Sequence, residues 1–251
     1  MNDLKANQAR STYEEHSMAS ANGGSGAMFD RIARRYDLLN RIMSLGLDQS
    51  WRKRLVRSLD VDVAAKVLDV ATGTADVALA VADEYPRARV TGLDPSVQML
   101  DIGRDKVDEL GLGHRIELLE GDAQQLPFEN DHFDASVVSF GIRNVPDRAQ
   151  ALREMSRVTR SHGKVVVLEL NEPKGGLMSA LARFHVHHVV PRVGALLSGA
   201  HEYRYLQDSI EAFPAPADFE QMMRDAGLID VRSHKLSFGA AYVFIGEVAE
   251  H

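Results

Sequence analysis

Two apolar, strand-like runs that each end in an aspartate constrain the fold of this chain more than any other feature. The first is Lys66-Val-Leu-Asp-Val-Ala-Thr-Gly-Thr-Ala-Asp76 and the second is Ala88-Arg-Val-Thr-Gly-Leu-Asp-Pro-Ser96. Asp94 therefore follows Asp69 by roughly 25 residues. In an open parallel sheet, ligands bind at the carboxyl edge, where an acid that ends the second strand meets ribose hydroxyls. The pair predicts a site for an adenosine-type cofactor.

Apolar strand candidates alternate with helical segments from residue 66 onward. The strand candidates are 67–70, 89–93, 116–119, 133–140 and 164–170, and the helical candidates are 76–84, 96–110 and 147–158. A helix near 218–226 and two closing strands, 231–236 and 240–247, are expected to follow. Because parallel strands joined by right-handed crossovers produce such alternation, the chain is expected to adopt an α/β fold.

The N-terminal part differs from this pattern. Residues 1–26 are polar and glycine-rich, which is typical of a flexible tail, and residues 27–251 are expected to form a single domain. Phe29, Ile32, Tyr36 and Leu39 recur at helical spacing and predict an N-terminal helix. Asp48 is expected to cap the next helix, whose apolar face would carry Trp51, Leu55 and Leu59.

The segment 174–213 interrupts the alternation between the fifth strand and the next helix. It contains a Gly-Gly pair and an apolar, histidine-rich run. Its position beside the cofactor edge suits a helical lid or a substrate pocket, and a simple packing pair of helices is the alternative.

Composition restricts the class of protein. The chain has 251 residues, of which 45% are hydrophobic and 26% are charged, and it has no cysteine that could form a disulfide or act as a thiolate. No apolar run is long enough to span a bilayer, and the N-terminus lacks the apolar stretch of a secretory signal. A net charge of −7 argues against broad nucleic-acid binding. A cytoplasmic enzyme is expected, and the sequence leaves open peripheral membrane contact and homo-oligomerisation.

The loop after the first strand indicates which cofactor is bound. It has neither the Gly-x-Gly-x-x-Gly pattern of a dinucleotide site nor the Lys-Ser/Thr pair of a phosphate loop. Gly73 permits close approach of a nucleoside to the backbone, Asp69 can accept from an ammonium group, and Thr74 can donate to a carboxylate. S-adenosylmethionine carries both of these groups, and a turn that binds nothing is the alternative.

Three further strand ends supply candidates at the same edge. Asp122 follows the third strand and could accept from an adenine amino group, with backbone groups near Ala123 completing the contact with the base. Ser139 ends the fourth strand near the expected methionine part of the cofactor. Arg143 comes soon after Ser139 and is charged at every relevant pH, so it suits stabilisation of a developing oxyanion. A surface salt bridge is the alternative for Arg143.

With these motifs together, the chain resembles the ubiquinone/menaquinone biosynthesis C-methyltransferases, a class I S-adenosylmethionine-dependent family. The resemblance spans roughly residues 28 to 247 and rests on four blocks: 36–46 leading to Trp51, 69–76, 139–145 and 203–210. It implies a Rossmann-like class I methyltransferase fold, with a mostly parallel seven-stranded sheet, helices on both faces, N-terminal helices and a helical lid insertion at 174–213.

The resemblance also assigns roles to residues. It implies that cofactor contacts come from Thr74, Asp94, Asp122, Ala123 and Ser139. By position in the family motifs, the substrate-pocket candidates are Tyr36, Asn40, Asn144, Tyr203 and Ser209, with Arg143 as the catalytic residue. The implied reaction is methylation of a ring carbon of a polyprenylated quinol, either demethylmenaquinol or the corresponding benzoquinol. The oxidised quinone lacks the required electron density, so the reduced form is the expected substrate.

This chain departs from the family pattern at three places. Asp48 stands where the family usually has a histidine, Arg160-Ser-His-Gly163 replaces a Lys-Pro-Gly-Gly type of turn, and Glu169-Leu-Asn171 replaces a Glu-Phe-Ser pattern. Histidines 185, 187, 188 and 201 have no matching carboxylate pattern, so no metal site is expected. Three rival functions are a methyltransferase acting on oxygen or nitrogen, a nicotinamide-dependent dehydrogenase and a non-catalytic scaffold.

Overall fold

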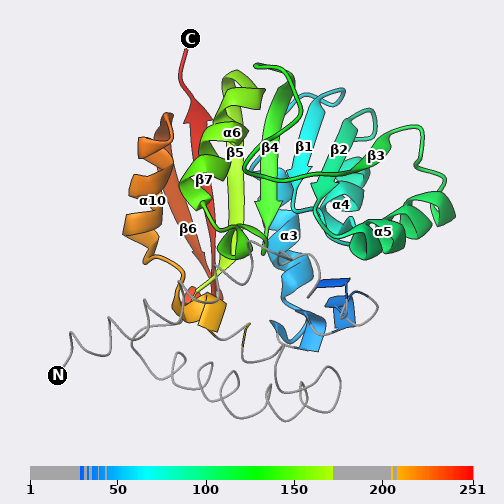
Figure 1. Cartoon of the computed structure of the whole chain (residues 1–251), viewed down its shortest axis with the longest axis horizontal. Helices are drawn as coiled ribbons and strands as arrows, with labels where there is room; N and C mark the ends of the chain where they lie inside the picture. Colours follow the sequence, from blue (N-terminus) through cyan, green and yellow to red (C-terminus); the bar gives the residue numbers. More distant parts are fainter. Residues whose placement is uncertain are drawn as a thin grey trace.

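A seven-stranded sheet forms the centre of the molecule. The computed structural model describes residues 29–30, 33, 36–38, 40–42, 44–171, 205 and 208–250. The strands are β1 Lys66–Val70, β2 Arg89–Asp94, β3 Ile116–Glu120, β4 Phe133–Ser139, β5 Thr159–Leu170, β6 Leu228–Leu236 and β7 Ala241–Val248. Their order across the sheet is β3-β2-β1-β4-β5-β7-β6 (Figure 1).

The pairing confirms the predicted mostly parallel sheet. β1 pairs in parallel with both β2 and β4, and β2–β3 and β4–β5 are parallel as well. β7 pairs in the antiparallel sense with β5 and with β6. The strand order reverses between β1 and β4, which is the point where open sheets of this kind bind ligands at their carboxyl edge.

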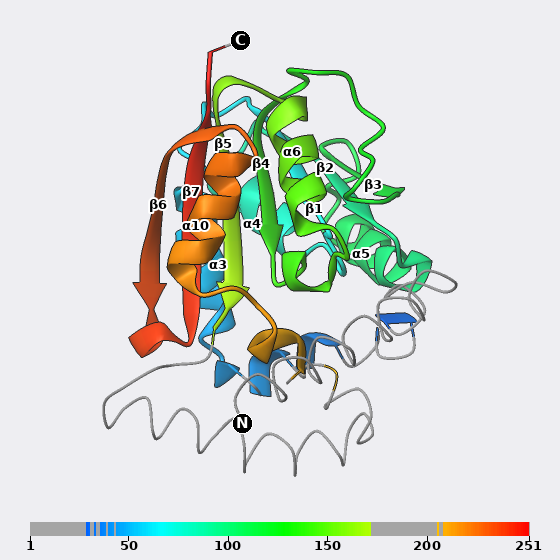
Figure 2. The same ribbon diagram turned by 60° about the vertical axis from the view of Figure 1, so that its left-hand side comes forward.

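Helices cover both faces of the sheet (Figures 1 and 2). The helices are α3 Asp48–Arg57, α4 Asp76–Glu84, α5 Val97–Glu109, α6 Arg148–Val158 and α10 Pro216–Asp225. One apolar core lies between the sheet and α3, α4 and α5, and the other lies between the sheet and α6 and α10. The strands between the two cores are almost continuously apolar in sequence, which is typical of a sheet that is buried on both faces.

The residues that cap the helix N-termini show how far the local sequence predicts where a helix begins. Ser96 caps α5 by accepting from the backbone N–H of Met99, and Asp147 caps α6 by accepting from the backbone N–H of Gln150, three residues further on. The expectation that Asp48 caps α3 is wrong. Leu47 is the N-cap residue, and the Asp48 carboxylate is instead bonded to the Ser44 hydroxyl and to Arg52.

The fifth strand begins earlier than predicted. β5 starts at Thr159, and its pairing register with β4 jumps by three extra residues between Thr159 and Lys164. The expected turn is therefore a bulge within one strand. Gly163 is required there, because a Cβ atom would lie 2.6 Å from the Asp134 carbonyl oxygen.

The described residues of the N-terminal segment, between 29 and 44, lie along the carboxyl edge of the sheet, beneath the ends of the parallel strands in Figure 1. These residues are helical, as their spacing predicts. The expected tail 1–26 and almost all of the expected lid insertion 174–213 lie outside the described residues. In the part of the chain that is described, no helix is long and apolar enough to cross a bilayer.

Candidate functional site

The loop between β1 and α4 is held in an uncommon backbone conformation. Ala71, Gly73 and Ala75 all have positive φ angles, of 52°, 54° and 66°. Left-handed conformations cost a non-glycine residue roughly 1–2 kcal/mol each, and such strain concentrates at functional sites. The loop is fastened to β2, because the Thr72 backbone N–H donates to the Leu93 carbonyl oxygen at 3.1 Å.

Asp94 connects this loop to the start of α5. Its Oδ2 accepts from the backbone N–H of Gly73 at 2.8 Å, and its Oδ1 accepts from that of Ser96 at 2.9 Å. Burial raises the pKa of Asp94 to about 6, and the two backbone hydrogen bonds offset part of that rise. The side chain lies at the pocket wall, where an ionised carboxylate is placed to accept from hydroxyl groups.

Asp69 lies beneath the loop and is only 1% exposed. Its Oδ2 accepts from the Thr72 hydroxyl at 2.6 Å and from the Ala78 backbone N–H at 3.1 Å. Burial raises the pKa of this carboxyl to about 7, against the effect of both hydrogen bonds. The contacts seen for Asp69 thus organise the loop and the first turn of α4.

A pocket opens at the carboxyl edge between the β1, β2, β3 and β4 loops and the N-terminal segment. Its lining is mainly apolar, with a few polar side chains. The lining residues are Phe29, Tyr36, Ala71, Gly73, Leu93, Asp94, Pro95, Met99, Asp122, Ala123, Phe140, Gly141, Asn144, Val145 and Pro146. This combination of apolar walls and few polar groups is usual for small-molecule sites.

The structure places some of the predicted site residues at this pocket and others outside its lining. Those that line it are Tyr36, Gly73, Asp94, Asp122, Ala123 and Asn144. Those absent from the lining are Asn40, Asp69, Thr74, Ser139, Arg143 and Ser209. Among the described residues, the buried Ser139 hydroxyl has no hydrogen-bond partner. Tyr203 lies outside the described residues.

Arg143 lies behind the pocket wall in a buried ion pair with Glu169. Its guanidinium is 2.5 Å from Glu169 Oε1 and also donates to the Phe140 carbonyl oxygen at 2.7 Å. The side chains of Arg143 and Glu169 are 2% and 0% exposed. Glu169 Oε2 further accepts from the Arg143 backbone N–H, so the glutamate fixes the short 3₁₀ turn Ile142–Asn144.

Tyr36 joins this ion pair to the pocket. Burial raises the pKa of its phenol, whereas the charge of Arg143 and a hydrogen bond with Asn40 act in the opposite direction. Beside it, the Tyr205 hydroxyl donates to Asn144 Oδ1 at 3.4 Å. A tyrosine phenol that lines the pocket therefore experiences the Arg143 charge directly.

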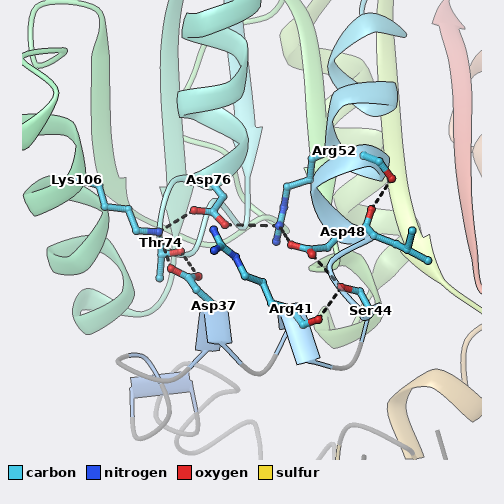
Figure 3. Close-up of polar contacts among 10 residues, drawn as sticks. Asp37, Arg41, Ser44, Asp48, Arg52, Thr74, Asp76 and Lys106 are labelled. Carbon is cyan, nitrogen blue, oxygen red and sulfur yellow. Dashed lines mark hydrogen bonds and ion pairs between the residues drawn. The ribbon is translucent and has the colours of Figure 1, made fainter. Parts of the chain in front are cut away.

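A second polar cluster links the loop after β1 to the N-terminal segment (Figure 3). The Thr74 hydroxyl donates to Asp37 Oδ1 at 2.7 Å instead of facing the pocket. Within the same cluster Arg52 pairs with Asp48 at 2.5 Å, and its guanidinium also lies 5.4 Å from the centre of the Phe140 ring. Asp48 therefore contributes a buried carboxylate that fixes Arg52 against a pocket-lining aromatic residue.

Sequence reasoning missed several residues of the site. Glu169 ends a parallel strand just as Asp69 and Asp94 do, so the same rule could have found it. By contrast, the contacts of Asp37 and Lys106 join residues 69 positions apart, and no short motif signals them.

Comparison with known proteins identifies the family. Residues 18–247 match the model of the ubiE/COQ5 methyltransferase family. The chain belongs to this family. Among its relatives, the ubiquinone/menaquinone biosynthesis C-methyltransferase UbiE of Syntrophotalea carbinolica is 46% identical over 87% of this chain and 92% of the relative. The demethylmenaquinone methyltransferases of Deinococcus radiodurans and Thermus thermophilus are 44% and 43% identical, each over 88% of this chain and over 90% and 99% of the relative.

Solved structures support the fold. A putative S-adenosyl-L-methionine-dependent methyltransferase from Methanococcus maripaludis matches with a TM-score of 0.63, at 17% identity over 88% of this chain and 94% of that one. The [4+2]-cyclase SpnF matches with a TM-score of 0.66, at 17% identity over 90% and 96% of the two chains. At these identities the likeness establishes the class I methyltransferase fold alone.

Proposed function

We propose that this family member transfers the methyl group of S-adenosylmethionine to a ring carbon of a polyprenylated quinol, converting demethylmenaquinol to menaquinol. The observation that carries the proposal is the family match over residues 18–247, with relatives named demethylmenaquinone methyltransferase that align over most of their length. Other relatives are named for both ubiquinone and menaquinone biosynthesis, so the equivalent benzoquinol is the second candidate substrate.

The residues at the pocket fit S-adenosylmethionine. Gly73 exposes the backbone of the cofactor loop, with nothing within 4 Å of the place where a Cβ atom would lie. Asp94 is a carboxylate at the end of β2, where ribose hydroxyls are expected. Asp122 and Ala123 line the β3 end of the pocket, where the adenine edge would lie. When bound, the cofactor supplies an electrophilic methyl group on a sulfonium.

Arg143 is proposed to stabilise the reacting phenolate. Removal of a hydroxyl proton from the quinol makes the ortho ring carbon nucleophilic, so the enzyme must favour the phenolate over the phenol. Tyr36 is itself a phenol at this wall, and the Arg143 charge lowers its pKa even though burial has the larger, opposite effect. A substrate hydroxyl bound beside Tyr36 at this wall would experience stabilisation by the same charge. Glu169 offsets part of that charge and keeps Arg143 fixed.

The apolar parts of the pocket suit the remainder of the substrate. Phe29, Met99, Phe140 and Val145 present apolar surface to the pocket, and burial of an isoprenoid tail gains about 25 cal/mol per Å² before ordering costs. The lid insertion 174–213 and the N-terminal helices are proposed to enclose that tail. Peripheral contact with a membrane is proposed as the route by which a lipid substrate reaches the pocket.

The direct test is transfer of labelled methyl from S-adenosylmethionine to a short-chain demethylmenaquinone, with and without a reductant. We expect label on the ring carbon only when the quinone is reduced, because only the quinol can become a phenolate. A parallel assay with the benzoquinone analogue ranks the two substrates. Label on oxygen, or transfer that does not depend on reduction, would contradict the proposed reaction.

A further inference from the structure

Two aspartates of the N-terminal segment attach it to the two ends of α5. Asp30 Oδ1 accepts from the Ser96 hydroxyl at 2.6 Å and from the Gln98 backbone N–H at 3.3 Å, at the start of the helix. Asp37 lies seven positions further along and pairs with Lys106, in the last turn of α5, at 2.6 Å. The segment is thus tied down at both ends of one helix.

Lys106 is the central cation of this arrangement (Figure 3). Its ammonium lies 2.6 Å from Asp37 Oδ2 and 2.7 Å from Asp76 Oδ1, at the first residue of α4. Asp37 in turn accepts from the Thr74 hydroxyl of the cofactor loop. One lysine in the last turn of α5 therefore connects the N-terminal segment, the loop after β1 and the start of α4.

Each anchoring aspartate directly follows an aromatic residue of the pocket. Phe29 precedes Asp30 and Tyr36 precedes Asp37, and both rings line the pocket. The two rings contact each other edge to face, with centroids 5.8 Å apart. Adjacent residues are joined through the backbone, so anchoring the carboxylates of Asp30 and Asp37 also holds the neighbouring aromatic rings at the pocket.

We infer that Lys106 is a positioning residue for cofactor binding, which acts through Asp37 to hold Tyr36 over the pocket and Thr74 in the loop. The inference rests on the proposed use of S-adenosylmethionine. The three side chains are 26–31% exposed, so the ion pairs are partly shielded from water. Without Lys106, the carboxylates of Asp37 and Asp76 would lose the cation that lies between them. Asp76 would keep only Arg52, at 3.5 Å, so repulsion between the two carboxylates would displace the segment.

The test measures binding of S-adenosylhomocysteine by calorimetry, so that no turnover is needed. We expect Lys106→Met to weaken binding roughly ten-fold, a size common for coupled contacts. Turnover at saturating S-adenosylmethionine should stay within about two-fold, which separates positioning from a catalytic role. The matched control is Lys164→Met, because Lys164 pairs with Asp60 at the same 2.6 Å but on β5, away from the pocket.

Neutralising Asp37 supplies a second measurement. If Lys106 had only a structural role, this change would not restore affinity for S-adenosylhomocysteine. Asp37→Asn keeps an oxygen for the Thr74 hydroxyl but removes the repelling charge. In the Lys106→Met background it should therefore cause no further loss of affinity and should recover part of it. Chemical denaturation of the ligand-free variants should show similar small losses of stability for Lys106→Met and Lys164→Met.

The outcomes separate the two proposals. If the wild-type protein does not bind S-adenosylhomocysteine, the proposed function and this inference both fail. If the wild type binds and Lys106→Met binds within two-fold of it, only the positioning role is overturned. Additive losses in the double variant would likewise overturn it, because the two residues would then act independently.

Discussion

Asp94 shows how one carboxylate can hold a site together and remain available to a ligand. Its oxygens accept from the backbone N–H groups of Gly73 and Ser96, so it fixes the loop after β1 against the start of α5. Burial raises its pKa to about 6, which places its titration near physiological pH. The residue that is proposed to bind ribose is therefore also a pH-sensitive part of the site.

The first prediction is that cofactor affinity falls as the pH is lowered through about 6. A raised pKa means that Asp94 is increasingly protonated below that pH, and a protonated carboxyl accepts from hydroxyl groups poorly. Calorimetry of S-adenosylhomocysteine binding between pH 5 and 8 should show an affinity loss approaching ten-fold per unit well below pH 6. Asp94→Asn should bind weakly at every pH, without that dependence. An unchanged affinity at pH 5 would refute the placement.

The second prediction concerns the buried pair of Arg143 and Glu169. Arg143→Met leaves Glu169 uncompensated in a buried place, so it should cost about 3–5 kcal/mol of unfolding free energy. Adding Glu169→Gln removes that charge and should recover most of the stability, as measured by denaturant titration. Turnover should remain low in both variants, because the stabilising charge for the phenolate is gone. Recovered turnover in the double variant would contradict the role of Arg143.

At the residue scale, sequence rules located side chains that end strands and missed those that meet across the fold. Asp94 could be predicted because an acid at the end of a second parallel strand has one usual position. Arg143 was expected at the active edge, yet its ion pair with Glu169 joins the turn after β4 to the end of β5, across 26 residues of sequence. Whether the predicted residues contact the cofactor stays a prediction.

At the scale of elements, close approach of loops shapes the pocket. Gly141 begins the turn after β4, and a Cβ atom there would lie only 2.5 Å from the Ala71 Cβ in the loop after β1. Both residues line the pocket. The two loops can therefore form adjoining walls only because one of them has no side chain at the point of contact.

The third prediction is that Gly141→Ala separates these loops. Overpacking of this kind should cost about 1–3 kcal/mol of unfolding free energy, and affinity for S-adenosylhomocysteine should fall with it. Gly113→Ala is the control, because the nearest atom to its added Cβ would be Asp108 Oδ1 at 3.7 Å, an ordinary contact. Denaturant titration and calorimetry of both variants make the comparison. Equal effects in the two variants would refute the steric argument.

The elements themselves were largely predictable, since apolar runs of strand length alternate with helical segments. Two features were not. β7 inserts between β5 and β6 in the antiparallel sense, an order that depends on long-range pairing. The β5 bulge at residues 159–164 was interpreted as a turn, because glycine and polar residues are typical of both.

At the scale of the whole molecule, one continuous sheet carries the loops that line most of the pocket. The pocket residues come from the loops of β1 to β4 and from the N-terminal segment, while β7 and β6 lie at the other end of the sheet, with α10 packed against them. Two apolar cores, one on each face, extend across these strands. We propose that residues 27–251 unfold as one cooperative domain, so that a ligand bound at one edge stabilises all of it.

The last prediction follows from that coupling. A ligand at 100 times its Kd that binds only the folded state adds about 2.7 kcal/mol, and each kcal/mol raises the Tm of a chain of this size by about 2–4 °C. Saturating S-adenosylhomocysteine should therefore raise the Tm by roughly 5–10 °C in a single transition seen by calorimetry. Asp94→Asn should show little shift, whereas Lys164→Met should match the wild type. Two transitions, of which only one responds to the ligand, would show instead that the pocket half of the sheet unfolds independently of β6 and β7.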